Sequence, residues 1–155
     1  MNDIWSRITV GIVLDHPSKM HEVGLEIGRQ IEPNQTLSLQ GNLGDGKTTL
    51  SKGIAAGWGV KTTVKSPTFN YFLTYEGERG LLVHLDAYRL GGPEEYESLM
   101  LEEILTDPWL LLVEWPDRVT GCLPQPNTTL RLESIDESTR RLSMKASDPF
   151  GSPDS

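Results

Sequence analysis

The sequence predicts an α/β domain whose sheet mixes parallel and antiparallel strands. Three segments carry this prediction: a glycine-rich stretch at 41–46, a pair of apolar runs at 70–86 and a continuous apolar run at 109–113. The glycine-rich stretch lies between a strand-like and a helix-like segment, a succession that is typical of α/β proteins. The paired runs indicate a hairpin, so the sheet is not expected to be purely parallel.

The first half of the chain is expected to contain two strands and two helices. Residues 7–14 are rich in β-branched side chains and are predicted to form a strand. Ser18 is expected to cap a helix whose apolar residues recur at helical spacing, namely Met20, Val23, Ile27 and Ile31. Residues 36–40 alternate as a short strand, and residues 47–58 show helical spacing that ends at Gly59.

The second half is expected to complete the sheet. Residues 70–86 place two apolar, aromatic runs around a glycine-containing turn, which is typical of a hairpin. Pro93, followed by two glutamates, suits the first turn of a helix. Residues 109–113 are too short an apolar run for a helix and predict a buried central strand. Two weaker strands are expected at 128–132 and 140–146.

Composition excludes several classes of protein. The 155 residues are 37% hydrophobic and 23% charged, which suits one globular domain, expected over 1–146 with a flexible tail at 147–155. No apolar run approaches the ~18 residues needed to cross a bilayer. The N-terminus lacks the features of a secretory signal, and the single Cys122 cannot form an internal disulfide, so a cytoplasmic location is expected.

The chain is acidic, with a net charge of −8. Most of the excess lies in residues 76–117, which contain eleven acidic and two basic side chains. Direct binding to a phosphate backbone needs basic clusters, so this charge argues against a nucleic-acid-binding surface on the chain itself. Most of these acidic side chains are expected to lie on solvated helix faces.

Residues 41–48, GNLGDGKT, match the pattern G-x-x-x-x-G-K-[ST] of a phosphate-binding P-loop. The glycines let consecutive backbone N–H groups surround a phosphate, and the following helix adds the partial positive charge of its N-terminus. Lys47 is expected to contact the β- and γ-phosphates, and the Thr48 hydroxyl to ligate Mg²⁺. The expected nucleotide-binding residues are Gly41, Asn42, Leu43, Gly44, Asp45, Gly46, Lys47, Thr48 and Thr49.

A P-loop site also needs a carboxylate on the metal side, and two candidates end predicted strands. Glu114 ends LLLVE, and Asp86 ends LLVHLD. Open α/β sheets bind ligands at the C-terminal ends of their strands, so both acids are candidate catalytic and metal-binding residues. The residues alone do not decide which of the two is the main metal ligand.

For three further residues close to these motifs, the local sequence gives a less specific indication of function. Thr68 lies in SPTF, after the P-loop helix, where other P-loop enzymes carry a switch that senses the γ-phosphate, although the local sequence indicates only a turn. His84, inside a strand, is interpreted as a structural histidine. Trp115 is interpreted as a packed aromatic side chain.

Missing motifs narrow the class of P-loop protein. No lysine is followed two positions later by aspartate, so the guanine-reading motif of GTPases is absent. A small-molecule kinase would fit the chain length, but such enzymes usually carry an arginine-bearing lid, and the one close arginine pair is at 140–141. A kinase and a nucleotide-dependent binding module without hydrolysis therefore stay open as alternatives.

Five segments in order resemble the bacterial TsaE (YjeE) family: GNLGDGKTTLSKG, VKSPTF, HLDAYRL, LVEWPDRV and LPQPN. The resemblance covers residues 20–130 and is more specific than the P-loop alone. It implies a P-loop NTPase-like three-layer α/β fold with a mixed sheet. It also implies an ATPase component of tRNA threonylcarbamoyladenosine biosynthesis, a modification of the adenosine next to the anticodon.

The resemblance further implies roles for individual residues. Thr48 and Glu114 would hold Mg²⁺, Asp86 would aid hydrolysis or hold the metal, and Thr68 would belong to the switch. The family usually has Asp at position 42 and a small residue at position 45, whereas this chain has Asn42 and Asp45. Neither side chain is an expected phosphate ligand, and Asp45 is expected to point to solvent.

The implied cofactors are ATP and Mg²⁺, and the implied partner is a TsaB–TsaD-type complex that contacts tRNA. The chain would permit turnover of that complex and would contact tRNA only through it. No strong general base or internal arginine finger is evident, so hydrolysis is expected to be weak alone and stimulated by the partner. The acidic segment 94–103 is an expected docking face for a basic partner.

Overall fold

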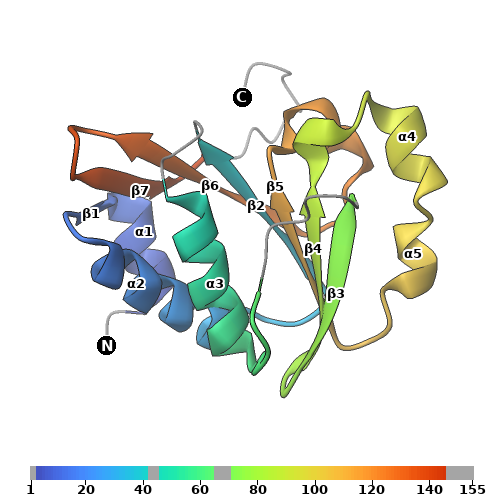
Figure 1. Cartoon of the computed structure of the whole chain (residues 1–155), viewed down its shortest axis with the longest axis horizontal. Coiled ribbons are helices and arrows are strands. Elements are labelled where there is room, and N and C mark those ends of the chain that lie inside the picture. Colours follow the sequence, from blue (N-terminus) through green and yellow to red (C-terminus); the bar gives the residue numbers. More distant parts are fainter. Residues whose placement is uncertain (1–2, 42–45, 65–70, 146–155) are drawn as a thin grey trace.

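The computed structural model describes residues 3–41, 46–64 and 71–145 (Figure 1). Its elements are α1 (Ile4–Val10), β1 (Ile12–Leu14), α2 (Pro17–Gln30), β2 (Gln35–Gly41), α3 (Lys47–Trp58), β3 (Phe72–Gly77), β4 (Gly80–Asp86), η1 (Ala87–Arg89), α4 (Pro93–Ser98), α5 (Leu101–Ile104), β5 (Trp109–Glu114), η2 (Pro116–Arg118), η3 (Thr120–Cys122), β6 (Asn127–Ser134) and β7 (Arg140–Met144). Among these elements, none is a helix long and apolar enough to cross a membrane.

The strands form one seven-stranded sheet in the order β1-β7-β6-β2-β5-β4-β3. Its centre is parallel, because β2 pairs with both β5 and β6, and β4 pairs with β5. Antiparallel strands flank this centre: β3 pairs with β4, β7 pairs with β6, and β1 pairs with β7. The predicted α/β fold with a mixed sheet is confirmed, and the hairpin of β3 and β4 supplies the antiparallel pairing at one edge of the sheet.

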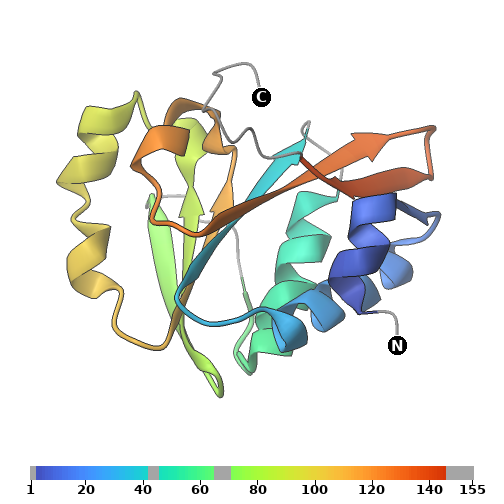
Figure 2. The same ribbon diagram turned by 180° about the vertical axis from the view of Figure 1, so that it is seen from behind.

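Helices cover both faces of the sheet, which gives three layers (Figures 1 and 2). The larger core packs α1, α2 and α3 against one face, and it includes Leu39 of β2 and Leu112 of β5. The smaller core packs α4 and α5 against the other face, with Val83 of β4 and Val113 of β5. Strand β5 is buried on both faces, which accounts for its continuous apolar run. The neighbouring β2 is equally buried but alternates, with Leu37 and Leu39 on the α1–α3 side and the buried hydroxyls of Thr36 and Ser38 on the other.

Helices α2 and α3 lie unusually close together through four glycines. A Cβ atom added to Gly24 would lie 2.7 Å from the Leu50 carbonyl oxygen, and one added to Gly28 would lie 2.1 Å from the Ile54 carbonyl oxygen. Gly53 and Gly57 of α3 approach the α2 backbone in the same way. Because residue 24 faces 50–54 and residue 28 faces 54–58, the helices run in the same direction, with their N-termini together.

The C-terminal end of α2 is held by Arg79 from the β3–β4 turn. Its guanidinium donates to the carbonyl oxygens of Gly28, at 2.5 Å, and Ile31, at 2.6 Å. It also lies over the Trp58 ring, 4.6 Å from its centroid. One side chain therefore satisfies two carbonyls at the end of α2 and contacts the last residue of α3.

The N-terminal segment differs from the prediction. Residues 7–10 belong to helix α1 rather than to a strand, and the strand is confined to Ile12–Leu14. The Asp3 side chain accepts from the Ser6 N–H and caps α1, while Ile4 and Ile8 share one buried face. Cap and packing together outweigh the local β propensity.

Two further helices differ from the prediction in where they begin or end. His16, not Ser18, caps α2, since its Nδ1 accepts from the Ser18 N–H at 3.0 Å and Pro17 occupies the first turn. The acidic segment 94–103 is not one helix, because Met100 adopts a left-handed conformation (φ 54°) between α4 and α5. Its glutamates are exposed.

The remaining elements follow the prediction. The strands predicted at 36–40, 109–113, 128–132 and 140–146 correspond to β2, β5, β6 and β7, and the predicted helix 47–58 is α3. Gly59 ends α3 in the left-handed conformation (φ 102°). The tail predicted at 147–155 lies outside the described residues.

Candidate functional site

The described residues of the segment that matches the P-loop pattern lie at the end of β2 and the start of α3. Gly41 ends β2, and Gly46, with φ 95°, directly precedes Lys47 at the start of α3. Thr48 is exposed and Thr49 half-buried in the first turn of that helix. Four predicted nucleotide-binding residues and the predicted switch residue lie outside the described part of the chain: Asn42, Leu43, Gly44, Asp45 and Thr68.

Lys47 is a buried cation at the root of the loop, with 6% of its surface exposed. Its Nζ donates to the Gly41 carbonyl oxygen at 2.7 Å and lies 4.1 Å from the centroid of the Trp115 ring. The carbonyl and the ring face stabilise an ammonium group that has lost most of its water. The positive charge is therefore fixed between the two ends of the loop.

The two predicted carboxylates come together at the C-terminal edge of the sheet. Asp86 ends β4 and Glu114 ends β5, and they are direct partners in the register of these parallel strands. Leu82 and Leu112 pack on the α2–α3 side, and side chains alternate along a strand, so both acids lie on that same side. The sheet thus brings both acids to the face on which α3 begins.

The surroundings of the two acids differ. Glu114 is 7% exposed, and its Oε2 lies 2.6 Å from Nε2 of the buried His84. Asp86 Oδ1 accepts from the Tyr88 N–H at 3.1 Å, and Arg89 Nε lies 3.8 Å from Oδ2. Burial raises the pKa of the Asp86 carboxyl, the Tyr88 N–H opposes this shift and the charge of Glu114 adds to it.

Trp115 joins the carboxylate edge to the P-loop. It has a left-handed backbone conformation (φ 59°), and its N–H donates to the Leu39 carbonyl oxygen at 3.2 Å. Its half-buried ring contacts Tyr88 at a centroid distance of 5.2 Å as well as Lys47. Trp115 is a packed aromatic residue, as expected, but what it packs against is the P-loop lysine.

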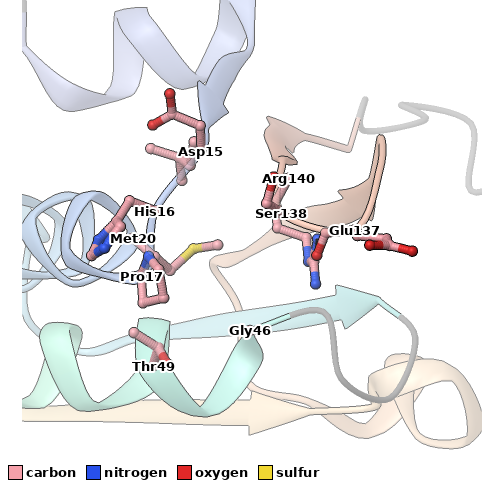
Figure 3. Close-up of a pocket in the computed structure, with 10 residues that line it drawn as sticks. Asp15, His16, Pro17, Met20, Gly46, Thr49, Glu137, Ser138 and Arg140 are labelled. Atoms are coloured by element: carbon pink, nitrogen blue, oxygen red, sulfur yellow. Dashed lines mark hydrogen bonds between the residues drawn. The ribbon is translucent and has the colours of Figure 1, made fainter.

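A cavity of about 470 Å³ lies beside the start of α3 (Figure 3). Three segments line it: the end of β1 with the start of α2, the start of α3, and the β6–β7 turn. The lining residues are Leu14, Asp15, His16, Pro17, Met20, Gly46, Thr49, Glu137, Ser138 and Arg140. Sequence reasoning missed this cavity. Its walls come from three segments far apart in the chain, and no motif marks the first or the last of them.

The donor atoms at this site suit a hard cation. Among the described residues, no group of three or more His, Cys, Asp or Glu side chains could by itself enclose a metal ion. Mg²⁺ needs no such enclosure, since it binds one or two carboxylates together with phosphate oxygens and water. Asp86 and Glu114 supply carboxylates in register, and Thr48 supplies a hydroxyl one residue after Lys47.

Comparison with known proteins shows the family of the chain. The family model described as threonylcarbamoyl adenosine biosynthesis protein TsaE matches residues 14–142. The tRNA threonylcarbamoyladenosine biosynthesis protein TsaE of Treponema pallidum is 33% identical over 121 residues, which cover 78% of this chain and 89% of that protein. The protein of the same name from Streptomyces coelicolor is 38% identical over 117 residues, covering 74% of this chain and 78% of the relative.

A solved structure shares the fold. The crystal structure of YdiB from Bacillus subtilis superposes with a TM-score of 0.69 and 25% sequence identity, over 90% of this chain and 86% of that one. The family match extends from β1 to β7 and includes every described P-loop residue and both carboxylates. The chain therefore belongs to the TsaE family of tRNA threonylcarbamoyladenosine biosynthesis proteins.

Proposed function

We propose that this chain binds Mg²⁺-ATP and hydrolyses it slowly, as the nucleotide-driven component of tRNA threonylcarbamoyladenosine modification. The observation that carries the proposal is the placement of Lys47 at the N-terminus of α3, on the side of the sheet where Asp86 and Glu114 end in register. A cation, a helix N-terminus and two carboxylates converging at one edge suit a metal-bound polyphosphate.

Each residue of the site has a distinct role in the proposed reaction. Lys47 neutralises charge on the β- and γ-phosphate oxygens, and Trp115 limits the positions open to its ammonium group. Thr48, Glu114 and Asp86 would hold Mg²⁺, which when bound neutralises phosphate charge as a Lewis acid. Asp86, less buried than Glu114, is also suited to accept a hydrogen bond from the attacking water.

The cavity beside Gly46 and Thr49 is suited to the nucleoside. Leu14, Pro17 and Met20 offer apolar surface to a flat ring, while Asp15 and Ser138 offer polar atoms to its edge. The cavity lies next to the first turn of α3, so a nucleoside there stays connected to phosphates at the P-loop. The position of the cavity beside Gly46 and Thr49 favours a nucleotide ligand over free phosphate.

Slow hydrolysis and dependence on a partner follow from what the site contains. Apart from the carboxylates assigned to the metal, the described site residues include no strong general base. The acidity of the chain argues against a direct grip on tRNA, so we propose a TsaB–TsaD-type complex as the partner that contacts RNA. Completion of the site by that complex would accelerate turnover.

Phosphate release tests the proposal. We expect little release from the isolated chain, more with a TsaB–TsaD complex, and ATP-dependent capture of the chain by that complex.

Glu114→Ala should keep much of the nucleotide affinity and lose Mg²⁺-dependent turnover; retained turnover would assign the metal to Asp86. Charge reversal at Glu94, Glu95 and Glu97 in the same capture assay tests the acidic segment as the docking face.

Three outcomes would contradict the proposal or part of it. ATP consumption that depends on an added metabolite would make the chain a small-molecule kinase. Binding to the complex without phosphate release, even when assembled, would make it a binding module without hydrolysis. Turnover of the isolated chain at many cycles per second would contradict the proposed dependence on the partner.

A further inference from the structure

His84 is a buried polar residue that the proposed reaction does not use directly. It lies in β4, two residues before Asp86, with 1% of its surface exposed. Its Nε2 is 2.6 Å from Oε2 of Glu114, which is itself 7% exposed. The pair joins two residues 30 positions apart, on adjacent strands and on the α3 side of the sheet.

The contact engages one of the two carboxylate oxygens of Glu114. A carboxylate only accepts hydrogen bonds, so His84 must donate through an N–H at Nε2. Among the described residues, His84 is the one side chain that donates to Glu114. The hydrogen bond engages Oε2, so Oε1 is the oxygen that remains for a ligand.

The imidazole ring is itself held in place by its neighbours in the sheet. In the strand register, His84 pairs with Leu73 of β3 on one side and with Leu112 of β5 on the other. Directly paired residues place their side chains side by side on one face, so the ring lies between two leucines. Nδ1 has no hydrogen-bond partner among the described residues, so the one directional contact of the ring is with Glu114.

We propose that His84 is a positioning residue that fixes Oε2 of Glu114 and thereby presents Oε1 to the Mg²⁺ of a bound nucleotide. This inference rests on the proposed function. Partners that orient metal-binding side chains typically change metal affinity about 10- to 100-fold when removed. A histidine that merely filled the core would affect stability without affecting the metal.

Three substitutions separate these roles. His84→Leu removes the donor, His84→Gln keeps an N–H at about the position of Nε2, and His84→Asn keeps a polar group too short to reach Glu114. Ser38→Ala is the matched control, because it removes another buried side-chain hydrogen bond of the same sheet, to Asn127 at 2.9 Å, outside the carboxylate pair.

The measurement is Mn²⁺ binding to the protein–ADP complex by electron paramagnetic resonance, beside ADP affinity without metal and thermal unfolding. We expect His84→Leu and His84→Asn to weaken Mn²⁺ binding about 10- to 100-fold with metal-free ADP affinity unchanged. His84→Gln should recover most of the wild-type value, and Ser38→Ala should lower only stability.

Equal Mn²⁺ affinity in wild type, His84→Leu and His84→Asn would overturn the inference and leave the proposed function intact. Failure of His84→Gln to recover binding, with the protein folded, would also overturn it. Wild-type protein that binds no ADP, or binds it without Mn²⁺, would instead contradict the proposed function. If His84→Leu does not fold, the comparison of His84→Asn with His84→Gln decides the question.

Discussion

The close packing of α2 on α3 makes Gly28 the most sensitive position in the interface. Gly28→Ala places a methyl group 2.1 Å from the Ile54 carbonyl oxygen and 2.8 Å from the backbone nitrogen of Trp58. Ordinary contact begins near 3.4 Å, so the backbones must separate locally by about 1.3 Å. Both obstacles are backbone atoms of α3, which cannot turn aside as a flexible side chain can.

The expected cost combines two opposing effects. Overpacking a well-packed core typically costs about 1–3 kcal/mol, and a clash with backbone belongs at the upper end. Alanine favours the helix over glycine by about 1 kcal/mol, which offsets part of the loss. The free energy of unfolding should therefore fall by about 2 kcal/mol, which lowers Tm by about 4–8 °C for a chain of this size.

Thermal and urea unfolding of the isolated chain would measure this change. Gly121→Ala is the matched control, because a methyl group there meets nothing within 4 Å, and its Tm should stay close to wild type. A Gly28→Ala protein as stable as wild type, or more stable, would contradict this prediction. The two helices would then not be in the close contact described.

Two further predictions concern charged side chains. Burial raises the pKa of the Asp86 carboxyl, so the ionised carboxylate is disfavoured in the folded state. The free energy of unfolding therefore falls as the pH rises from 3.8, the ordinary pKa of the group, through the higher pKa of the folded state. Asp86→Asn should therefore raise Tm at pH 7, with a gain that shrinks toward pH 4, while Mg²⁺-dependent phosphate release falls; an equal or lower Tm at pH 7 would contradict this. Arg79→Ala removes the two hydrogen bonds at the end of α2 and should cost about 2 kcal/mol in urea unfolding, with Arg79→Lys restoring part of it. An unchanged midpoint in Arg79→Ala would show that the capping contact does not stabilise the fold.

The positions of Lys47, Asp86 and Glu114 in the fold could be predicted because the signals for them are local. The P-loop is one contiguous motif, and its flanking strand and helix follow from their own periodicity. Asp86 and Glu114 each end an apolar run, and parallel strands bring such ends to one edge. Their exact register, however, became visible only with the sheet assembled.

Several features that escaped prediction depend on segments that are far apart in the chain. The cavity joins residues 14–20 with 137–140, and the His84–Glu114 pair joins neighbouring strands 30 residues apart. At the N-terminus, β-branched residues favoured a strand, yet the Asp3 cap and the burial of Ile4 and Ile8 select a helix. Tertiary contacts determine the cavity and the His84–Glu114 pair, and at the N-terminus a local cap and tertiary burial together outweigh the β propensity of the residues.

Binding of ATP at the start of α3 can be measured by calorimetric titration of the protein with a non-hydrolysable ATP analogue and Mg²⁺. The informative comparison is Lys47→Ala against Lys52→Ala, an exposed lysine of the same helix. We expect one binding site in wild type and Lys52→Ala, and no measurable binding in folded Lys47→Ala. Equal affinity of all three proteins for the analogue would contradict it.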